Sequence, residues 1–259
     1  MKAIILAAGK GRRLNNAAKD KPKCLIEIGS QSILSRITSA LREGGVNDIS
    51  LVRGYKRKAF DDPSIRYYDN LKFKTTNMLY SLYIAKDELN DECIISYSDI
   101  IYGSEAVKAL LEDGDDITLL VDIDWRRRYV GRRCHPVEEA ELVYMEDGRP
   151  VKFGKRIAPN DAYGEFVGLL KLSKVGAEII YSQLKRLEPR FKSDGKDRFH
   201  QAINIRHAYL TDMFQELVEC GFRLANVDIK GGWHEIDTEE DLERVRALYH
   251  QGLKYVKDN

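Results

Sequence analysis

The chain has 259 residues, 43% of them hydrophobic and 32% charged, which suits one α/β domain with a sizeable core. Its 42 basic and 41 acidic residues give a net charge of +1, so no overall field draws it toward nucleic acid or anionic lipid. Four scattered cysteines without a C-x-x-C pair argue against a zinc site or a disulfide framework, and no apolar run approaches about 18 residues, so we expect a cytoplasmic protein without a membrane partner.

The first half of the chain, about residues 1–124, alternates strand and helix signals. This pattern is typical of a mostly parallel sheet with helices on both faces. In the helix expected over 32–45, Ile33, Ile37 and Leu41 share one face, and two glycines end it. The expected strands span residues 2–8, 48–54, 64–69, 92–100 and 116–124, and the other expected helices span 77–89 and 104–114.

The second half, about residues 125–259, changes rhythm and predicts a small hairpin and helical insertion within one domain over 1–259. Residues 139–157 suggest a hairpin about the Asp147-Gly148 turn, and the polar stretch 188–201 is expected to be a loop or lid. Thr238 and Asp241 supply a start signal for the last helix. Further strands are expected at 164–173 and 223–229, and helices at 174–187, 208–221 and 238–256.

A glycine-bearing loop, "ILAAGKGRRL" (5–14), follows the first expected strand. Gly9 and Gly11 match the start of a dinucleotide-binding fingerprint, but Leu14 stands where the third glycine belongs. The spacing of a P-loop is also absent. The loop is therefore neither of these two nucleotide-binding motifs.

What remains is a small loop rich in basic residues. It carries Lys10, Arg12 and Arg13, and Lys21 and Lys23 follow it. Glycines let backbone N–H groups approach a phosphate, and nearby cations offset its charge. A basic surface turn is the alternative, but the added Lys-Pro-Lys segment favours a polyphosphate site.

Two aspartates stand where acidic side chains can meet a ligand. Asp99 lies at the end of the apolar strand 92–100, and the carboxyl ends of parallel strands face the ligand crevice of α/β folds. Asp237 lies between a late strand and the last helix. Mg²⁺ on a triphosphate is usually held by one or two carboxylates plus water, a number that these residues supply. A turn aspartate and a helix-entry residue are the alternative interpretations.

"ILAAGKGRRL" followed by "KPKCLIEIGSQSIL" (21–34) resembles the nucleotidyltransferases that activate sugar phosphates and related compounds. The resemblance implies a Rossmann-like α/β fold of the nucleotide-diphospho-sugar transferase type. It also implies that Lys23, Arg13 and Asp99 are catalytic, and that Asp99 and Asp237 hold Mg²⁺, with Glu235 a weaker candidate. The nucleotide-binding residues that it implies are Leu6, Ala7, Ala8, Gly9, Gly11, Arg12, Arg13, Lys23, Asn77, Ser81 and Ser98.

The second half, together with one segment before it, is similar to cytidylyltransferases that act on phosphocholine or on phosphonates. The matching segments include "TNMLYSL" (76–82), "YGEFVGLLKLS" (163–173) and "GGWHEIDTEEDL" (231–242). In the first of these, Asn77 and Ser81 lie four residues apart and share a helix face. They are expected to reach the base or ribose; a helix cap beside a core stripe is the compatible alternative.

The expected acceptor site lies in the arginine-rich segment "DWRRRYVGRR" (124–133) and beyond it. Arg132 or Arg133 would bind the acceptor's phosphonate or phosphate. Trp125 and Tyr129 would pack on a cationic amine or serve as core anchors. Glu165 and Asp212 are assigned to the same site. Acidic neighbours at 137–141 make an RNA-binding role for the arginines the weaker alternative, and the histidines at 135, 207 and 234 are expected to be structural.

We therefore expect a Mg²⁺-dependent cytidylyltransferase that transfers CMP from CTP and releases pyrophosphate. The acceptor would be 2-aminoethylphosphonate, a hydroxyalkylphosphonate or phosphocholine in type. A sugar-1-phosphate uridylyl- or thymidylyltransferase and a non-catalytic nucleotide-binding regulator are the alternatives. The expected partners are these small molecules, in a monomer or homodimer and without nucleic acid.

Overall fold

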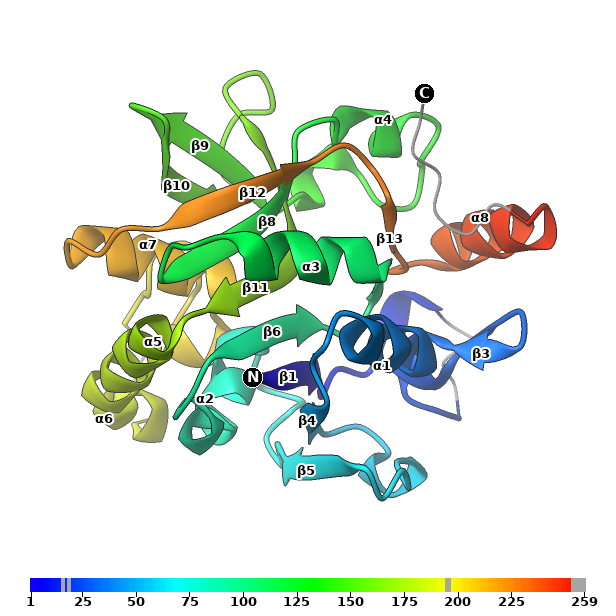
Figure 1. Cartoon of the computed structure of the whole chain (residues 1–259), viewed down its shortest axis with the longest axis horizontal. Coiled ribbons are helices and arrows are strands. Elements are labelled where there is room, and N and C mark those ends of the chain that lie inside the picture. The colour runs from blue at the N-terminus through cyan, green and yellow to red at the C-terminus, as the bar shows by residue number, and fades with distance from the viewer. Residues whose placement is uncertain (15–16, 18–19, 194–196, 253–259) are drawn as a thin grey trace.

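The computed structural model describes residues 1–14, 17, 20–193 and 197–252. One nine-stranded sheet runs through it and takes strands from both halves of the chain (Figure 1). Its strands are β1 (Lys2–Ala7), β4 (Asp48–Arg53), β5 (Ile65–Asp69), β6 (Cys93–Tyr97), β8 (Ile117–Asp122), β9 (Leu142–Glu146), β10 (Arg149–Gly154), β11 (Gly164–Leu172) and β12 (Ala225–Ile229).

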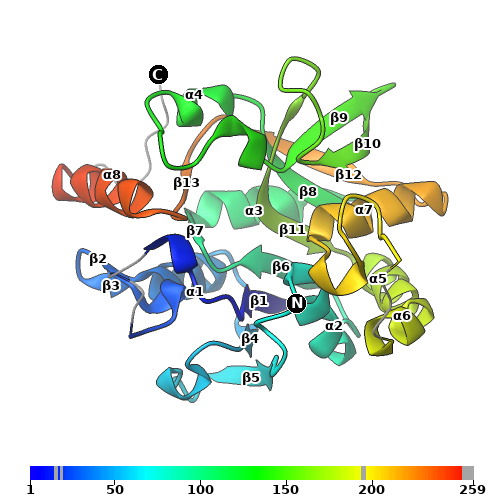
Figure 2. The ribbon, with the colours of Figure 1, turned by 180° about the vertical axis from the view of Figure 1, so that it is seen from behind.

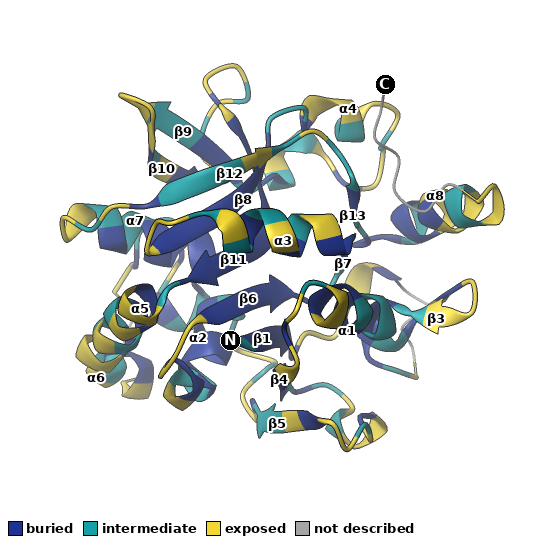
Figure 3. Ribbon diagram, in the orientation of Figure 1, coloured by how far each residue is buried: buried dark blue, intermediate teal, exposed yellow. Residues whose placement is uncertain are grey.

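The core of the sheet is parallel, as predicted. β4 and β6 flank β1 in parallel, and β5 continues the sheet in parallel beyond β4. β11 then runs antiparallel to β6 and to β8, while β12 pairs in parallel with β8. Every residue of β11 is buried, because this strand lies between its neighbours in the middle of the molecule (Figure 3).

Helices cover both faces of the sheet. α3 lies in front of the strands in Figure 1, whereas α7 lies in front of them when the molecule is seen from behind in Figure 2. The helices are α1 (Ile33–Glu43), α2 (Met78–Ile84), α3 (Ser104–Glu112), α4 (Arg126–Tyr129), α5 (Lys174–Arg186), α6 (Glu188–Lys192), α7 (Leu210–Glu219) and α8 (Glu239–His250). Within the described ranges, no helix is both long and apolar enough to cross a membrane.

Two turn and cap predictions are confirmed. β9 and β10 form the expected hairpin, and both Asp147 (φ 48°) and Gly148 (φ 75°) adopt the positive φ that a tight two-residue turn requires. Thr238 and Asp241 form a reciprocal capping box at the start of α8. The part of the closing helix expected at 253–256 lies outside the described residues.

Residues 188–201 are not wholly a loop, so that prediction is corrected. The first five residues of the stretch form α6, because Phe191 is buried and its ring stacks on Tyr83 with centroids 4.5 Å apart. Residues 194–196 lie outside the described part of the chain. The sequence also gave no sign of α4 or of the short ladder between β7 (Ile100–Tyr102) and β13 (Trp233–Glu235).

Candidate active site

The site lies at the carboxyl ends of β1 and β6. The glycine loop leaves β1, and a one-turn 3₁₀ helix at Lys23–Leu25 follows it. Asp99 comes two residues after β6, and Asp237 comes two residues after β13. The ladder between β7 and β13 brings the two aspartates together, and the Ile236 N–H donates to the Asp99 carbonyl at 2.8 Å.

Lys23 joins the two aspartates. Its ammonium Nζ donates to Asp99 Oδ2 at 3.0 Å and to Asp237 Oδ1. Arg13 donates to the other oxygen of Asp237, Oδ2. Four charged groups predicted from three distant segments of the sequence therefore form one ion cluster.

The cluster sets the charge state of its members. Burial alone would lower the pKa of Lys23, but the carboxylates of Asp237 and Asp99 raise it above its ordinary value. Burial alone would raise the pKa of Asp237, but Lys23 and Arg13 hold it below its ordinary range. Near neutral pH, Lys23 is a buried cation and Asp237 a buried anion.

Gly11 fixes the distance between the loop and Lys23. Its φ is +63°, which a residue with a side chain rarely adopts. A Cβ at this position would also lie 2.9 Å from Cβ of Lys23. Glycine is therefore required here both by the backbone conformation and by the close approach.

A cavity of about 210 Å³ opens between the loop and Lys23; we call it the glycine-loop cavity. It brings together most of the residues predicted to bind nucleotide, which supports their grouping and leaves their roles as predictions. Its lining consists of Leu6, Ala7, Gly9, Gly11, Arg12, Arg13, Lys23, Cys24, Met78, Ser98, Asp99 and Asp237.

A second cavity of about 180 Å³ adjoins the first; we call it the acidic cavity. Arg13, Met78, Asp99 and Asp237 line both cavities, so the ion cluster stands at their junction. The lining of the acidic cavity is completed by Asn77, Tyr97, Ile100, Glu139, Glu141, Lys155, Glu165, Phe166, Val167, Tyr209, Trp233 and Glu235.

Three carboxyl groups of the acidic cavity have raised pKa values. Burial raises the pKa of Glu165 to about 7 and that of Glu141 to about 7. Burial, together with the charge of Asp237, raises the pKa of Glu235 to about 8. Glu165 accepts a hydrogen bond from the Tyr129 hydroxyl at 2.6 Å through Oε1, while its Oε2 is buried without a partner among the described residues. A positively charged ligand would stabilise the ionised form of these carboxyl groups.

Three of the predicted nucleotide contacts do not line the glycine-loop cavity. Ser81 is buried and accepts a hydrogen bond from Asn70, so it serves the packing of α2, and Ala8 does not line the glycine-loop cavity. Asn77 is the N-cap residue of α2 and faces the acidic cavity. The Asn77 side chain makes no capping hydrogen bond, and the contact of Asn77 and Ser81 with the base or ribose stays a prediction.

Two predicted acceptor residues have structural partners and lie outside the acidic cavity. Trp125 is fully buried in a small core with Ala140, Leu142 and Ala162, so it is the core anchor that the sequence left open. Asp212 closes the capping box of α7, accepting from the Tyr209 N–H at 2.9 Å and the Gln201 N–H at 2.8 Å. Neither residue lines the acidic cavity.

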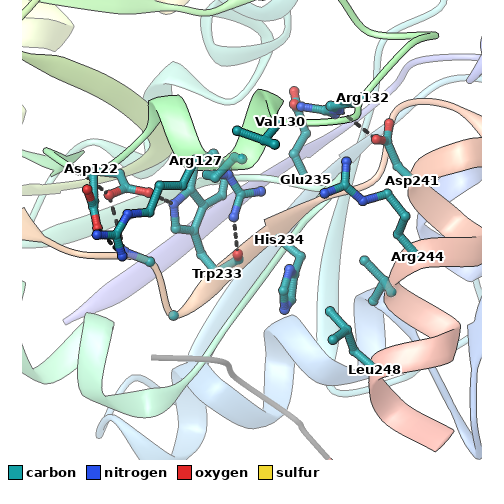
Figure 4. Close-up of a pocket in the computed structure, with 15 residues that line it drawn as sticks. Asp122, Arg127, Val130, Arg132, Trp233, His234, Glu235, Asp241, Arg244 and Leu248 are labelled. Atoms are coloured by element: carbon teal, nitrogen blue, oxygen red, sulfur yellow. Dashed lines mark hydrogen bonds and ion pairs between the residues drawn. The ribbon is translucent and has the colours of Figure 1, made fainter. Parts of the chain in front are cut away.

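Arg132 and Arg133 do not line the acidic cavity either. Arg132 is buried between Asp241 and Glu235, with N···O distances of 2.6 Å and 3.0 Å, and Figure 4 shows it turned toward Asp241. It lines a separate cavity of about 410 Å³ beneath α4 and α8. Arg133 is exposed, and its backbone N–H binds Glu240. The positions of both arginines depend on partners that are distant in the sequence, so the sequence alone could not predict them.

Some residues of the site were missed by sequence reasoning. Glu141, Lys155 and Tyr97 line the acidic cavity, and His135 is buried beside Glu235 and Asp237. Glu141 and Lys155 flank the hairpin of β9 and β10, and only the fold shows that these positions meet the crevice. His135 gave no signal, because its partners lie about 100 positions along the chain.

The residues present fit a magnesium ion. Asp99 Oδ2 and Asp237 Oδ1 converge on the same Lys23 ammonium, so their oxygens already gather around one positive charge. Carboxylate oxygens are the ligands that Mg²⁺ prefers, and two of them leave positions for phosphate and water. Asp99 and Asp237 are therefore the residues that would hold it.

A model of the MobA-like NTP transferase domain matches residues 3–161. Over 255 residues the chain is 32% identical to the CTP:phosphoglutamine cytidylyltransferase of Campylobacter jejuni, covering 94% of this chain and 98% of that protein. The solved inositol-1-phosphate CTP transferase from T. maritima superposes with a TM-score of 0.74 at 24% identity, over 96% of this chain and 95% of the other.

The CTP:phosphocholine cytidylyltransferase from Streptococcus pneumoniae superposes with a TM-score of 0.72 at 21% identity, over 96% of this chain and 98% of the other. At these identities the structural likeness concerns the fold. It confirms the predicted Rossmann-like fold of the nucleotide-diphospho-sugar transferase type.

Proposed function

The chain belongs to the MobA-like NTP transferase family, and we propose that it transfers CMP from CTP to a small phosphate or phosphonate monoester. The observation that carries the proposal is the ion cluster of Lys23, Asp99 and Asp237 at the junction of two cavities. A group transfer between two substrates requires such a junction, because the reacting atoms must meet where both substrates end. The names of the relatives support CTP as the nucleotide.

We assign the nucleotide to the glycine-loop cavity. Arg12, Arg13 and Lys23 supply three cations there, and the N–H groups of Gly9 and Gly11 can approach a phosphate closely. Lys23 is the buried cation of the three. We assign to it the stabilisation of the negative charge that develops at the α-phosphate. Arg13, whose side chain is 47% exposed, can turn from Asp237 to the triphosphate.

The reaction needs no general base. The acceptor's phosphate or phosphonate loses its second proton near pH 6 or somewhat above, so an anionic oxygen is available at neutral pH. That oxygen attacks the α-phosphorus of CTP, a new phosphorus–oxygen bond forms, and the bond to the β-phosphate oxygen breaks to release pyrophosphate. A Mg²⁺ held by Asp99 and Asp237 would neutralise triphosphate charge. The chain's own contribution is positioning and electrostatic stabilisation.

We assign the acceptor to the acidic cavity, and we infer that it carries a cationic amine. Six carboxyl groups line this cavity against only Arg13 and Lys155. Lys155 is already paired with Glu139 at 2.7 Å, and among the described residues no cation lies in hydrogen-bond contact with Glu141 or Glu165. Three aromatic residues, Tyr97, Tyr209 and Trp233, also line the cavity; Lys155 already lies over the Tyr209 ring and Arg128 over the Trp233 ring. Amine-bearing phosphonates and phosphocholine therefore fit better than uncharged polyol phosphates.

The test is pyrophosphate release from purified protein with Mg²⁺. Five nucleoside triphosphates are combined with phosphocholine, 2-aminoethylphosphonate, a phosphorylated amino acid amide, a hydroxyalkylphosphonate and glucose 1-phosphate. We expect release with CTP and an amine-bearing acceptor. Release with UTP or dTTP and glucose 1-phosphate would replace the proposal by a sugar-1-phosphate nucleotidyltransferase. CTP binding without release under any acceptor would favour a non-catalytic regulator.

A further inference from the structure

A buried histidine stands beside the ion cluster without a use in the reaction described above. His135 is 2% exposed, and neither of its ring nitrogens has a hydrogen-bond partner among the described residues. An unsatisfied polar group in the protein interior costs free energy, so its persistence calls for a reason.

The ring lies between two carboxylates. Nδ1 is 3.4 Å from Asp237 Oδ2, and Nε2 is 3.7 Å from Glu235 Oε2. One ligand atom from each of the three residues lies within 4.8 Å of the others. These separations are too long for good hydrogen bonds. The two carboxylates face different ring nitrogens, so one nitrogen can bind an ion while the other stays beside a carboxylate oxygen, and the Glu235 oxygen also accepts a hydrogen bond from Arg132 at 3.0 Å.

The chain around His135 is fixed in position. The N–H groups of Arg133 and Cys134 each donate to Glu240 Oε2 at 2.8 Å, which ties the loop to the start of α8. The Tyr129 ring packs against the imidazole with centroids 6.0 Å apart. The same helix start holds Asp237, whose N–H donates to Asp241. The histidine and the aspartate are therefore held by one element, α8.

We propose that His135, Glu235 and Asp237 form a binding site for a divalent transition-metal ion. The two oxygens of Asp237 face different partners: Oδ1 faces Lys23 beside Asp99, and Oδ2 faces Arg13 and His135. The site is therefore separate from the oxygen-only pair of Asp99 and Asp237 and shares one carboxylate with it. An imidazole nitrogen favours Mn²⁺, Co²⁺ or Zn²⁺ over Mg²⁺, which prefers oxygen.

The site adjoins the acidic cavity, because Glu235 and Asp237 line it. An ion bound here reaches the phosphate or phosphonate of an acceptor in that cavity and competes with Arg13 for Asp237. This consequence rests on the proposed function, whereas the binding of the ion does not.

The first experiment needs no substitution. Full-length protein without a histidine tag is loaded with Mn²⁺ and studied by pulsed electron paramagnetic resonance. We expect coupling of the manganese to the ¹⁴N of an imidazole. Absence of nitrogen coupling in the loaded protein would overturn the proposal, whether or not the protein transfers CMP.

The second experiment compares two substitutions. We expect His135→Gln to weaken Co²⁺ binding at least tenfold, measured by absorption titration, and to abolish the nitrogen coupling while Mg²⁺ affinity is unchanged. His250→Gln, at the exposed end of α8, is the matched control and should change neither. Unchanged Co²⁺ affinity in folded His135→Gln would contradict the proposal. Metal binding without CMP transfer to any acceptor would contradict the proposed function alone.

Discussion

The two adjoining cavities share Asp99 and Asp237 yet differ in charge. The glycine-loop cavity sets three basic side chains against these two aspartates, whereas the acidic cavity sets two basic side chains against six carboxyl groups. Phosphate oxygens are favoured in the first cavity, and a positive group is favoured in the second. The difference assigns the nucleotide and the acceptor to opposite sides of one ion cluster, so each side can be disabled separately.

The largest effect is expected from Lys23→Ala. The substitution removes the buried cation at the junction, and we expect kcat to fall by about 100- to 1000-fold, the cost of losing one preorganised charge at a reacting centre. Steady-state kinetics with CTP and the best acceptor measures it. Lys21→Ala, two residues away and outside both cavities, is the matched control. Near-wild-type turnover in Lys23→Ala would remove the basis of the assignment.

Glu165→Gln is expected to have a smaller effect, which is limited to the acceptor. The amide keeps an acceptor for the Tyr129 hydroxyl but loses the charge, so kcat/KM for an amine-bearing acceptor should fall by about 10- to 100-fold. The KM for CTP should not change. Because burial raises the pKa of Glu165 to about 7, the carboxylate is lost below that pH, and the advantage of the wild type should shrink there.

The control for Glu165→Gln is Glu146→Gln, at the exposed end of β9. An equal loss for amine-bearing and uncharged acceptors would mean that Glu165 shapes the cavity without recognising charge.

Gly11→Ala is expected to change the KM for CTP by about tenfold. The new Cβ meets Lys23 at 2.9 Å on a backbone with φ +63°, so the loop or the lysine must move. We expect the KM for CTP to rise while the KM for the acceptor stays near its wild-type value. Gly45→Ala also places a side chain at positive φ, but meets nothing within 4 Å, so it controls for backbone strain alone. Equal changes in both KM values would show that the cavities are not independent.

The smallest effect on catalysis is expected from Asp212→Ala. Loss of the α7 capping box should lower the free energy of unfolding by about 1 kcal/mol, seen as a lower Tm. Turnover per folded molecule should be unchanged, because Asp212 lines neither cavity. A selective rise in the acceptor KM would restore the role that the sequence suggested for it.

The glycine-loop side of the site could be predicted from sequence because its residues are local. Gly9, Gly11 and Arg13 lie within one loop, and Lys23 follows shortly after it. Asp99 could be placed because a polar residue at the end of a buried parallel strand points to the crevice wherever the strand lies in the sheet.

The acidic side could not be predicted in the same way, because tertiary pairing decides it. Arg132 could have bound an anion, but its guanidinium donates instead to Asp241, over 100 residues later in the chain. Trp125 could have faced a ligand, but a small second core covers it. Glu141 was absent from the predicted site, because it precedes β9 and reaches the crevice only when β9 pairs with β11.

The central claim is that the acidic cavity selects an acceptor by positive charge. The most direct measurement compares kcat/KM, with CTP and Mg²⁺, for phosphocholine against its carbon isostere 3,3-dimethylbutyl phosphate, and for 2-aminoethylphosphonate against propylphosphonate. Within each pair the shape is kept and only the charge changes. We expect the charged member of at least one pair to react about tenfold faster or more, and this preference to be lost in Glu165→Gln. Equal rates within both pairs, with measurable CMP transfer, would contradict the account.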